Sequence, residues 1–211
     1  MIKLSERLKA CTELVRRGKP LADIGTDHGY AVVYLVENKI VPRAVASDVN
    51  EGPLASCSAL VKEHGLENKI KCVLSDGLKN IEENEAEDIL IAGMGGELIS
   101  DILENCPYVS KKHLILNPMT HPEILRKWLF ENGFCINEDI VVRDGRHSYS
   151  ILDAYYTGKK KAYTATDLFL GNIKDFSDKD YFLHLLNYLT NKEKGGADYA
   201  EVISAIKENI K

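Results

Sequence analysis

The sequence lacks the features that mark membrane, secreted and metal-binding proteins. No window approaches the roughly 18 consecutive apolar residues of a transmembrane helix. The N-terminal segment MIKLSERLKACTELVRRGK carries charge every few residues and has none of the apolar core of a secretory signal. The five cysteines are dispersed, never spaced as CxxC, and not clustered with histidines. A cytoplasmic protein with reduced thiols, no membrane span and no metal is therefore expected.

Motifs of several enzyme classes are absent as well. No GxSxG, GxxxxGK[ST] or HExxH string occurs, which argues against hydrolases and nucleoside triphosphatases. The dinucleotide fingerprint GxGxxG is missing too, because Asp27 and Tyr30 stand where it requires glycine. Binding of NAD therefore loses its main support. His28, His121 and His147 have no metal-ligand spacing, so they are interpreted as structural or solvated side chains.

The composition is that of an ordinary globular protein, with 45% hydrophobic and 28% charged positions. The length of 211 residues suits one domain with a small appendage. The net charge of −5 is unevenly distributed, since residues 1–20 and 111–165 each carry a positive excess while residues 21–110 are strongly acidic. We expect the two basic segments to meet on one face around the functional site and to attract a polyanion.

Short apolar, β-branched runs alternate with helical periods between Pro20 and Ile151, which predicts a parallel sheet built from βαβ units. A first helix is expected before it, with Ser5 as N-cap and Gly18 as stop. Two further runs, 134–143 and 149–155, predict an antiparallel hairpin at the sheet edge, giving a Rossmann-like α/β sheet of about seven strands. The strands are expected at 21–25, 44–48, 70–75, 89–92 and 114–117, and the helices at 31–38, 53–64, 96–104 and 122–132.

The lysine run 159–161 marks a change in composition, after which no strand signal returns. Apolar residues then recur at helical spacing in two stretches, and Gly195-Gly196 between them predicts the turn of a helical hairpin. The chain is therefore divided into a domain over residues 1–160 and a small helical domain over residues 161–211. The second is too short for an independent core and should lean on the first, or on a partner.

The end of the first predicted strand carries the most informative motif. Asp23 to Tyr30 read D-x-G-x-x-x-G, which resembles the first motif of S-adenosylmethionine methyltransferases, although a bare strand-helix turn would also explain it. Asp48 ends the second strand, where a carboxylate can accept hydrogen bonds from both ribose hydroxyls or simply cap the next helix. Asp76-Gly77 ends the third strand, as an adenine contact or as an ordinary turn.

The fourth and fifth strands end in two further motifs. Glycines 93, 95 and 96 open room at the end of the fourth strand, although tight helix packing would explain one of them. The fifth strand ends in NPMT at residues 117–120, which resembles the (N/D)PP(Y/F) element of methyltransferases that modify a base nitrogen. An ordinary Asn-Pro turn is the alternative. The motif has no aromatic residue for stacking on a base, and Tyr30 is the nearest candidate for that role.

Taken together, these segments resemble the bacterial TrmK-like family of tRNA (adenine-N1)-methyltransferases, which act on adenine 22 in the D-loop. The resemblance covers about residues 2–155, and its DIGTDHGY and GMGG strings are the most specific part. The strings that carry it are LSERLKA at 4–10, ADIGTDHGY at 22–30, ASDVNEGPL at 46–54, LSDGL at 74–78, IAGMGGELI at 91–99 and NPMTHPEILRKWL at 117–129.

The resemblance implies a role for each matching position. Residues implied in cofactor binding are Asp23, Gly25, Thr26, His28, Gly29, Asp48, Val49, Asn50, Asp76, Gly77, Gly93, Met94 and Gly95. Residues implied in catalysis are Arg7, Asp27, Tyr30 and Asn117, and Pro118 and Met119 would face the target base. Within this set, Asp48 would hold the ribose hydroxyls and Arg7 would lie near the substrate.

The implied activity is methylation of adenine N1 in tRNA with S-adenosylmethionine as cofactor, in a monomer or weak homodimer. N1 has its own lone pair, so no strong general base is required, and a carboxylate such as Asp27 could stabilise the cationic product. The base would have to be unstacked to enter the site. Two alternatives remain open from the residues: a methyltransferase for a small molecule, and a non-catalytic nucleotide- or RNA-binding module.

Overall fold

A seven-stranded sheet with the order β3-β2-β1-β4-β5-β7-β6 organises the chain. The computed structural model describes residues 2–196 and 198–210, so the outer ends of the two predicted domains, residues 1 and 211, lie outside it. Strands β1 to β5 are parallel, and β7 runs antiparallel to both β5 and β6, which confirms the predicted edge hairpin. The strands are β1 Leu21–Ile24, β2 Ala44–Asp48, β3 Ile70–Leu74, β4 Asp88–Met94, β5 His113–Pro118, β6 Phe134–Asp144 and β7 His147–Tyr156.

Helices cover both faces of this sheet, which is why its central strands β1, β2 and β5 are buried along their whole length. One buried cluster joins α4 and α5 to the sheet, and the other joins α1, α2 and α3 to the opposite face. Helix α1 begins after Ser5 as predicted, with the Ser5 hydroxyl accepting from the Leu8 amide, but it ends at Glu13, before the predicted stop at Gly18. These helices are α1 Glu6–Glu13, α2 Tyr30–Glu37, α3 Glu51–Glu63, α4 Gly96–Glu104 and α5 Pro122–Glu131.

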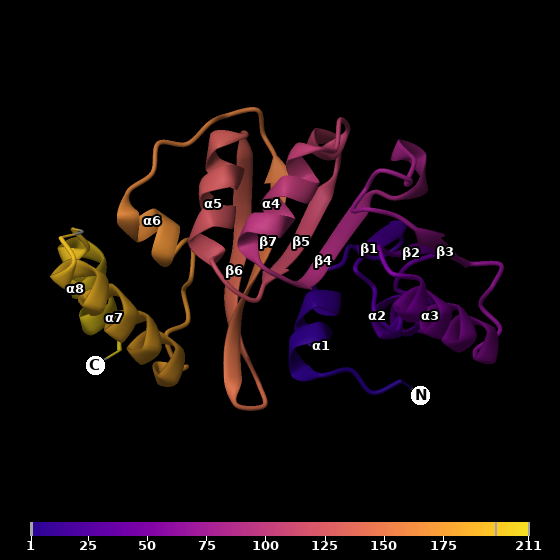
Figure 1. Cartoon of the computed structure of the whole chain (residues 1–211), viewed down its shortest axis with the longest axis horizontal. Helices are drawn as coiled ribbons and strands as arrows, with labels where there is room; N and C mark the ends of the chain where they lie inside the picture. Colours follow the sequence, from indigo (N-terminus) through magenta and orange to yellow (C-terminus); the bar gives the residue numbers. More distant parts are fainter. Residues whose placement is uncertain (1, 197, 211) are drawn as a thin grey trace.

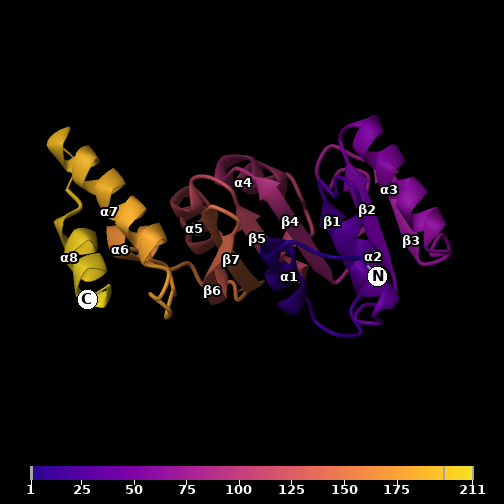
Figure 2. The ribbon, with the colours of Figure 1, turned by 90° about the horizontal axis from the view of Figure 1, so that it is seen from below.

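The C-terminal segment forms the predicted helical hairpin, preceded by a short helix that was not predicted. Figures 1 and 2 both place α7 and α8 at one end of the molecule, with α3 and β3 at the other. The segment has a small buried cluster of its own, contrary to expectation, and it leans on the sheet through Val141 of β6, which packs against that cluster. Its helices are α6 Ala165–Phe169, α7 Lys179–Lys194 and α8 Ala200–Asn209. None of the helices in the described ranges has the length and apolar character to cross a membrane.

The prediction that the two basic segments meet around the functional site is wrong for most of their charged residues. Arg16 lies at the amino end of β4, where its Nε is 2.8 Å from the buried Asp88 carboxylate. The Lys111 ammonium binds Glu83 at 2.7 Å, just before β5 begins. Both contacts lie at the amino ends of the parallel strands, whereas ligands bind at the carboxyl ends.

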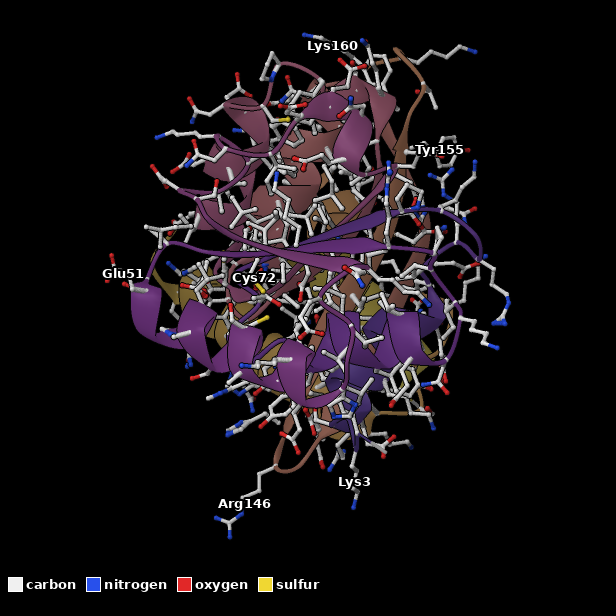
Figure 3. The ribbon with its side chains drawn as sticks, turned by 90° about the vertical axis from the view of Figure 1, so that its right-hand side faces the viewer. Lys3, Glu51, Cys72, Arg146, Tyr155 and Lys160 are labelled. Atoms are coloured by element: carbon white, nitrogen blue, oxygen red, sulfur yellow. The ribbon has the colours of Figure 1, made fainter. Side chains whose placement is uncertain are left out.

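The lysine run 159–161 follows the same pattern, because β7 runs antiparallel to β5 and returns the chain to the amino ends. Figure 3 shows Lys160 and Arg146 pointing outward at opposite ends of the molecule. Of the two basic segments, α1 with Arg7 and the tip of the β6-β7 hairpin do bring positive charge to the carboxyl ends, where Arg7 lies beside Asp144 and Tyr149. The net charge of a segment could not predict this arrangement, because it does not tell at which end of a strand the charged residues lie.

A buried ionic cluster stabilises the amino end of β5. The His113 ring lies between two carboxylates, with Nδ1 3.3 Å from Asp88 Oδ2 and Nε2 in contact with Asp153 Oδ1. Burial by itself lowers the pKa of His113, but the interactions with the Asp153 and Asp88 carboxylates outweigh it and raise the pKa to about 9. The ring is therefore an imidazolium cation at neutral pH, balancing two buried negative charges.

This cluster predicts a loss of stability in alkaline solution. A histidine whose pKa is raised on folding contributes its full stabilisation below its unfolded pKa of 6.5 and loses it as the pH rises through about 9. The wild-type free energy of unfolding should fall by up to about 3 kcal/mol between pH 6.5 and 9.5. Urea unfolding at both pH values checks this, with His113→Gln as the comparison. An equal pH dependence in the two proteins would remove His113 as the cause.

Candidate functional site

A cavity of about 530 Å³ opens at the carboxyl ends of β1 to β4, the edge where doubly wound sheets bind ligands. Most of the predicted site residues line it, although they come from six separate stretches of the chain. Those that line it are Arg7, Asp23, Gly25, Thr26, Asp27, His28, Tyr30, Asp48, Val49, Asn50, Asp76, Gly77, Gly93, Met94 and Met119.

The loop between β1 and α2 forms the floor of this cavity. The backbone amides of Gly25 and Thr26 both donate to Ser47 O at 2.8 Å, which ties the loop to β2. Gly25 has φ +71°, and a Cβ there would overlap the Met94 methyl group. Asp27 also has a positive φ of 54°, unusual for a residue with a side chain, and its carboxylate is exposed. The loop therefore takes a shape that the sequence Gly-Thr-Asp does not adopt by default.

Two buried carboxylates, on neighbouring strands, face the cavity. Asp48 accepts the Asn50 amide at 2.9 Å, and Asp23 accepts the Thr26 hydroxyl at 2.7 Å. Burial raises the pKa of Asp23 to about 6, and the negative charge of Asp48 adds to the shift. A ligand that brings positive charge to the cavity would relieve this repulsion and favour the ionised form of Asp23.

The loops after β4 and β5 are fastened to each other. The Met119 amide donates to Met94 O at 2.8 Å, and the Gly96 amide donates to Thr120 O at 2.8 Å. A Cβ at Gly96 would overlap His121 O, so the close approach of these two loops requires glycine there. Gly93 interrupts the β4-β5 register, has φ +91° and would place a Cβ in open space beside the cavity.

Asn117 lies behind the cavity wall and reaches it through Arg7. Its side chain is fully buried and does not line the cavity, but its Oδ1 accepts from Arg7 Nη1 at 2.7 Å. Arg7 is also held by the hairpin, since its Nε is 3.8 Å from Asp144 and its guanidinium lies 5.8 Å from the ring centre of Tyr149. The geometry therefore brings the N-terminal helix, β5 and the hairpin tip together at one point.

Three other predicted residues also lie outside the lining. Gly29 and Gly95 are the N-caps of α2 and α4, and Pro118 ends β5. A set of mainly apolar lining residues was not predicted, and among them Leu98 is half exposed. In the sequence, apolar residues at helical spacing look like core positions, so these residues were not predicted. The structure shows that Leu98 is exposed and can contact a ligand. The lining residues that were not predicted are Leu8, Ile24, Ala31, Pro53, Ser75, Ala92, Leu98 and Ile102.

The cavity can hold a ligand that combines hydroxyl groups, a flat apolar ring and positive charge. Buried Asp48 and Asp23 offer acceptors to hydroxyl or amino groups, while Val49 and Leu98 offer exposed apolar surface. Gly93 leaves its backbone accessible. Within the described ranges, no three His, Cys, Asp or Glu side chains are grouped in a way that would hold a metal ion.

Comparison with known proteins places this chain among methyltransferases. Residues 4–152 match a family model described as a methyltransferase domain. The chain is 35% identical over 172 residues to the tRNA (adenine(22)-N(1))-methyltransferase of Bacillus subtilis, covering 81% of this chain and 72% of that protein.

Solved structures agree in fold over the whole chain. The crystal structure of the B. subtilis m1A22 tRNA methyltransferase TrmK superposes with a TM-score of 0.84 at 27% identity, covering 100% of both chains. A putative tRNA (m1A22) methyltransferase of Streptococcus pneumoniae in complex with S-adenosyl-L-methionine gives 0.81 at 32% identity, covering 99% of this chain and 100% of that one.

Proposed function

The chain belongs to the TrmK-like family of bacterial tRNA (adenine-N1)-methyltransferases, and from this membership we propose its reaction and the residues that perform it. The reaction is methylation of adenine N1 in tRNA at adenine 22, with S-adenosylmethionine as methyl donor. The observation that carries the assignment to this cavity is the pair of buried carboxylates, Asp23 and Asp48, at neighbouring strand ends.

The residues present fit this cofactor. Its size agrees with a cavity of about 530 Å³, and its two positive charges suit the buried Asp23 and the exposed Asp27. Asp48 would accept both ribose hydroxyls, and Gly93 would offer its carbonyl to the ammonium group. Asp76 and Gly77 would meet the adenine, with Leu98 against its face.

The cofactor supplies a methyl group on a sulfonium centre, so the protein's task is to align adenine N1 with it. Met119 would orient the edge of the target base, and the buried Asn117 would act on the base through Arg7, which its Oδ1 holds. Tyr30, which is exposed at the cavity mouth, would stack on the base. Arg7 would contact the base or a nearby phosphate. Asp27 is exposed to water, so its stabilisation of the cationic product depends on bound tRNA excluding solvent.

We further propose that the protein acts in the cytoplasm as a monomer or weak homodimer without a metal. All five cysteines lie within the described residues and are free thiols, as a reducing compartment requires. We also propose that residues up to 160 bind the cofactor and the base, while the helical segment from 161 onward supports them. The separate buried cluster of that segment favours this division.

One assay tests the reaction as a whole. The protein is incubated with labelled S-adenosylmethionine and unmodified tRNA, and the methylated nucleoside is identified and located. The expected product is 1-methyladenosine at position 22. Methylation of small molecules alone would favour the first alternative activity. Cofactor binding with no methyl transfer to any tRNA would favour a non-catalytic module.

Replacing Arg7 by alanine should separate substrate handling from cofactor binding. The Arg7 guanidinium contacts Asn117 and the hairpin, but Asp23 and Asp48 hold their places without it. We expect methylation of tRNA to fall at least about a hundredfold, as for other removed transition-state donors. Cofactor affinity measured by calorimetry should change less than about twofold. Lys9→Ala, which removes a charge from the same helix, is the control, and normal turnover of Arg7→Ala would exclude the substrate role.

A further inference from the structure

A buried polar chain links Asn117 to the neighbouring strand β7. The Asn117 Nδ2 donates to the backbone oxygen of Ser150 at 2.9 Å. The hydroxyl of the same serine accepts from Arg126 Nη2 at 2.9 Å and donates to Asp139 Oδ1 at 3.0 Å. The side chains of Asn117, Arg126, Asp139 and Ser150 are all buried, so water does not compete for these hydrogen bonds. The orientation of the Asn117 amide is therefore determined from inside the protein.

Arg126 is the centre of this chain and has a partner for each N–H donor. Its side chain is 0% exposed, and its Nε and Nη2 bind the two oxygens of Asp139 at 2.8 and 3.0 Å. Its Nη1 donates to Leu168 O at 2.9 Å and Phe169 O at 3.3 Å, both in α6. The guanidinium thus bonds at once to the hairpin and to the C-terminal helices.

Ser150 needs this support because strand pairing leaves it free on one side. The ladder between β5 and β7 runs only from His113↔Tyr155 to Leu116↔Leu152, so it stops before Asn117 and Ser150 are reached. On the other side, Ser150 pairs with Val141 of β6. Between β5 and β7, the side chain of Asn117 continues the hydrogen bonding beyond the last backbone pair, by donating to the Ser150 carbonyl. The Ser150 hydroxyl, held by Arg126 and Asp139, fixes the residue that carries this carbonyl.

The remaining end of the Asn117 amide faces the substrate side. Because Nδ2 is committed to the Ser150 carbonyl, Oδ1 must point toward Arg7, from which it accepts at 2.7 Å. A displaced Ser150 carbonyl would release the amide to rotate and would present a donor where an acceptor is needed. An error of this kind affects alignment of the base with the methyl group more than it affects cofactor binding.

We propose that Arg126, Asp139 and Ser150 are positioning residues that hold the Asn117 amide in the orientation required for methyl transfer. The inference rests on the proposed role of Asn117 toward the target base. The buried ion pair between Arg126 and Asp139 then contributes to the reaction. Helix α6 supports the catalytic site as well, because its Leu168 and Phe169 carbonyl oxygens bind Arg126.

Ser150→Ala tests the proposal, and Ser148→Ala is its matched control. Both serines lie on β7, and the Ser148 hydroxyl also binds the C-terminal segment, donating to Asp178 Oδ2 at 2.6 Å, but it does not touch Arg126. We expect Ser150→Ala to lower kcat for tRNA methylation about tenfold. The KM for tRNA and the affinity for S-adenosylmethionine should change less than about twofold, and Ser148→Ala should keep the wild-type kcat. A wild-type kcat in Ser150→Ala would overturn the proposal.

A double variant identifies the route of the effect. If Ser150 acts through Asn117, adding Ser150→Ala to Asn117→Ala should cause no further loss of kcat. A further tenfold loss would overturn the proposal. In NMR spectra, the side-chain amide signal of Asn117 should shift in Ser150→Ala and not in Ser148→Ala. Normal methylation by Asn117→Ala alone is a different failure, because it would remove the proposed role of Asn117 itself.

Discussion

Replacing Asp48 by alanine is expected to weaken the binding of S-adenosylmethionine about a hundredfold. The Asp48 carboxylate is buried at the end of β2, and its Oδ1 is fixed by the Asn50 amide at 2.9 Å. A fixed carboxylate loses little entropy when it accepts two ribose hydroxyls. Hydrogen bonds to a charged group contribute about 1.5 to 3 kcal/mol each, so losing the pair costs on the order of 3 kcal/mol. Isothermal titration calorimetry measures the change directly.

Two further variants separate the hydrogen bonds from the charge. Asp48→Asn keeps the shape of the side chain and one acceptor, so its affinity should lie between those of the wild type and Asp48→Ala. Glu51→Ala removes a negative charge three residues away, from the exposed first turn of α3, which points outward in Figure 3 and does not line the cavity. It should bind as the wild type does. Unchanged affinity in Asp48→Ala would refute the ribose assignment.

The sheet could be predicted from the sequence because local pattern and tertiary position agree along it. Strand 44–48 and helix 96–104 have the expected bounds, and most other elements differ by one or two residues. The sequence alternates apolar strands with helices, and connections between parallel strands are right-handed, so only a few sheet topologies are compatible with it. The exceptions are local. Helix α1 ends at Glu13, five residues before its expected stop at Gly18. Helix α6 is a single short turn that begins with a Thr164 capping box, and its sequence shows no apolar period.

The candidate site was predictable where it depends on strand ends and unpredictable where it depends on packing. Asp23, Asp48 and Asp76 each end a strand, and parallel strands bring such positions to one edge. The position of Asn117 behind Arg7, by contrast, depends on a hairpin 33 residues further along the chain. Arg126 resembles an ordinary exposed helix residue in the sequence, and nothing near it indicates that Asp139 and α6 enclose it completely.

Replacing Asp139 by alanine is expected to destabilise the fold severely. The substitution would leave the Arg126 guanidinium, which is fully buried, without its counter-ion. Breaking a buried ion pair on one side costs about 3 to 5 kcal/mol, because the remaining charge can reach neither water nor a negative charge. For a chain of this length, the melting temperature should fall by roughly 10 °C. Trp128, the one tryptophan of the chain, lies two residues from Arg126 and reports unfolding by fluorescence.

Two comparisons make this prediction specific. Lys127→Ala breaks the exposed pair between Lys127 and Glu131 on the same helix, and it should cost less than about 1 kcal/mol. The double variant Arg126→Met/Asp139→Leu removes both charges, so it should recover part of the stability lost in Asp139→Ala. It should not recover all of it, because Leu168 O and Phe169 O lose their donor. A loss in Asp139→Ala as small as in Lys127→Ala would show that Arg126 finds another partner, and the enclosed guanidinium would no longer explain how α6 is held on α5.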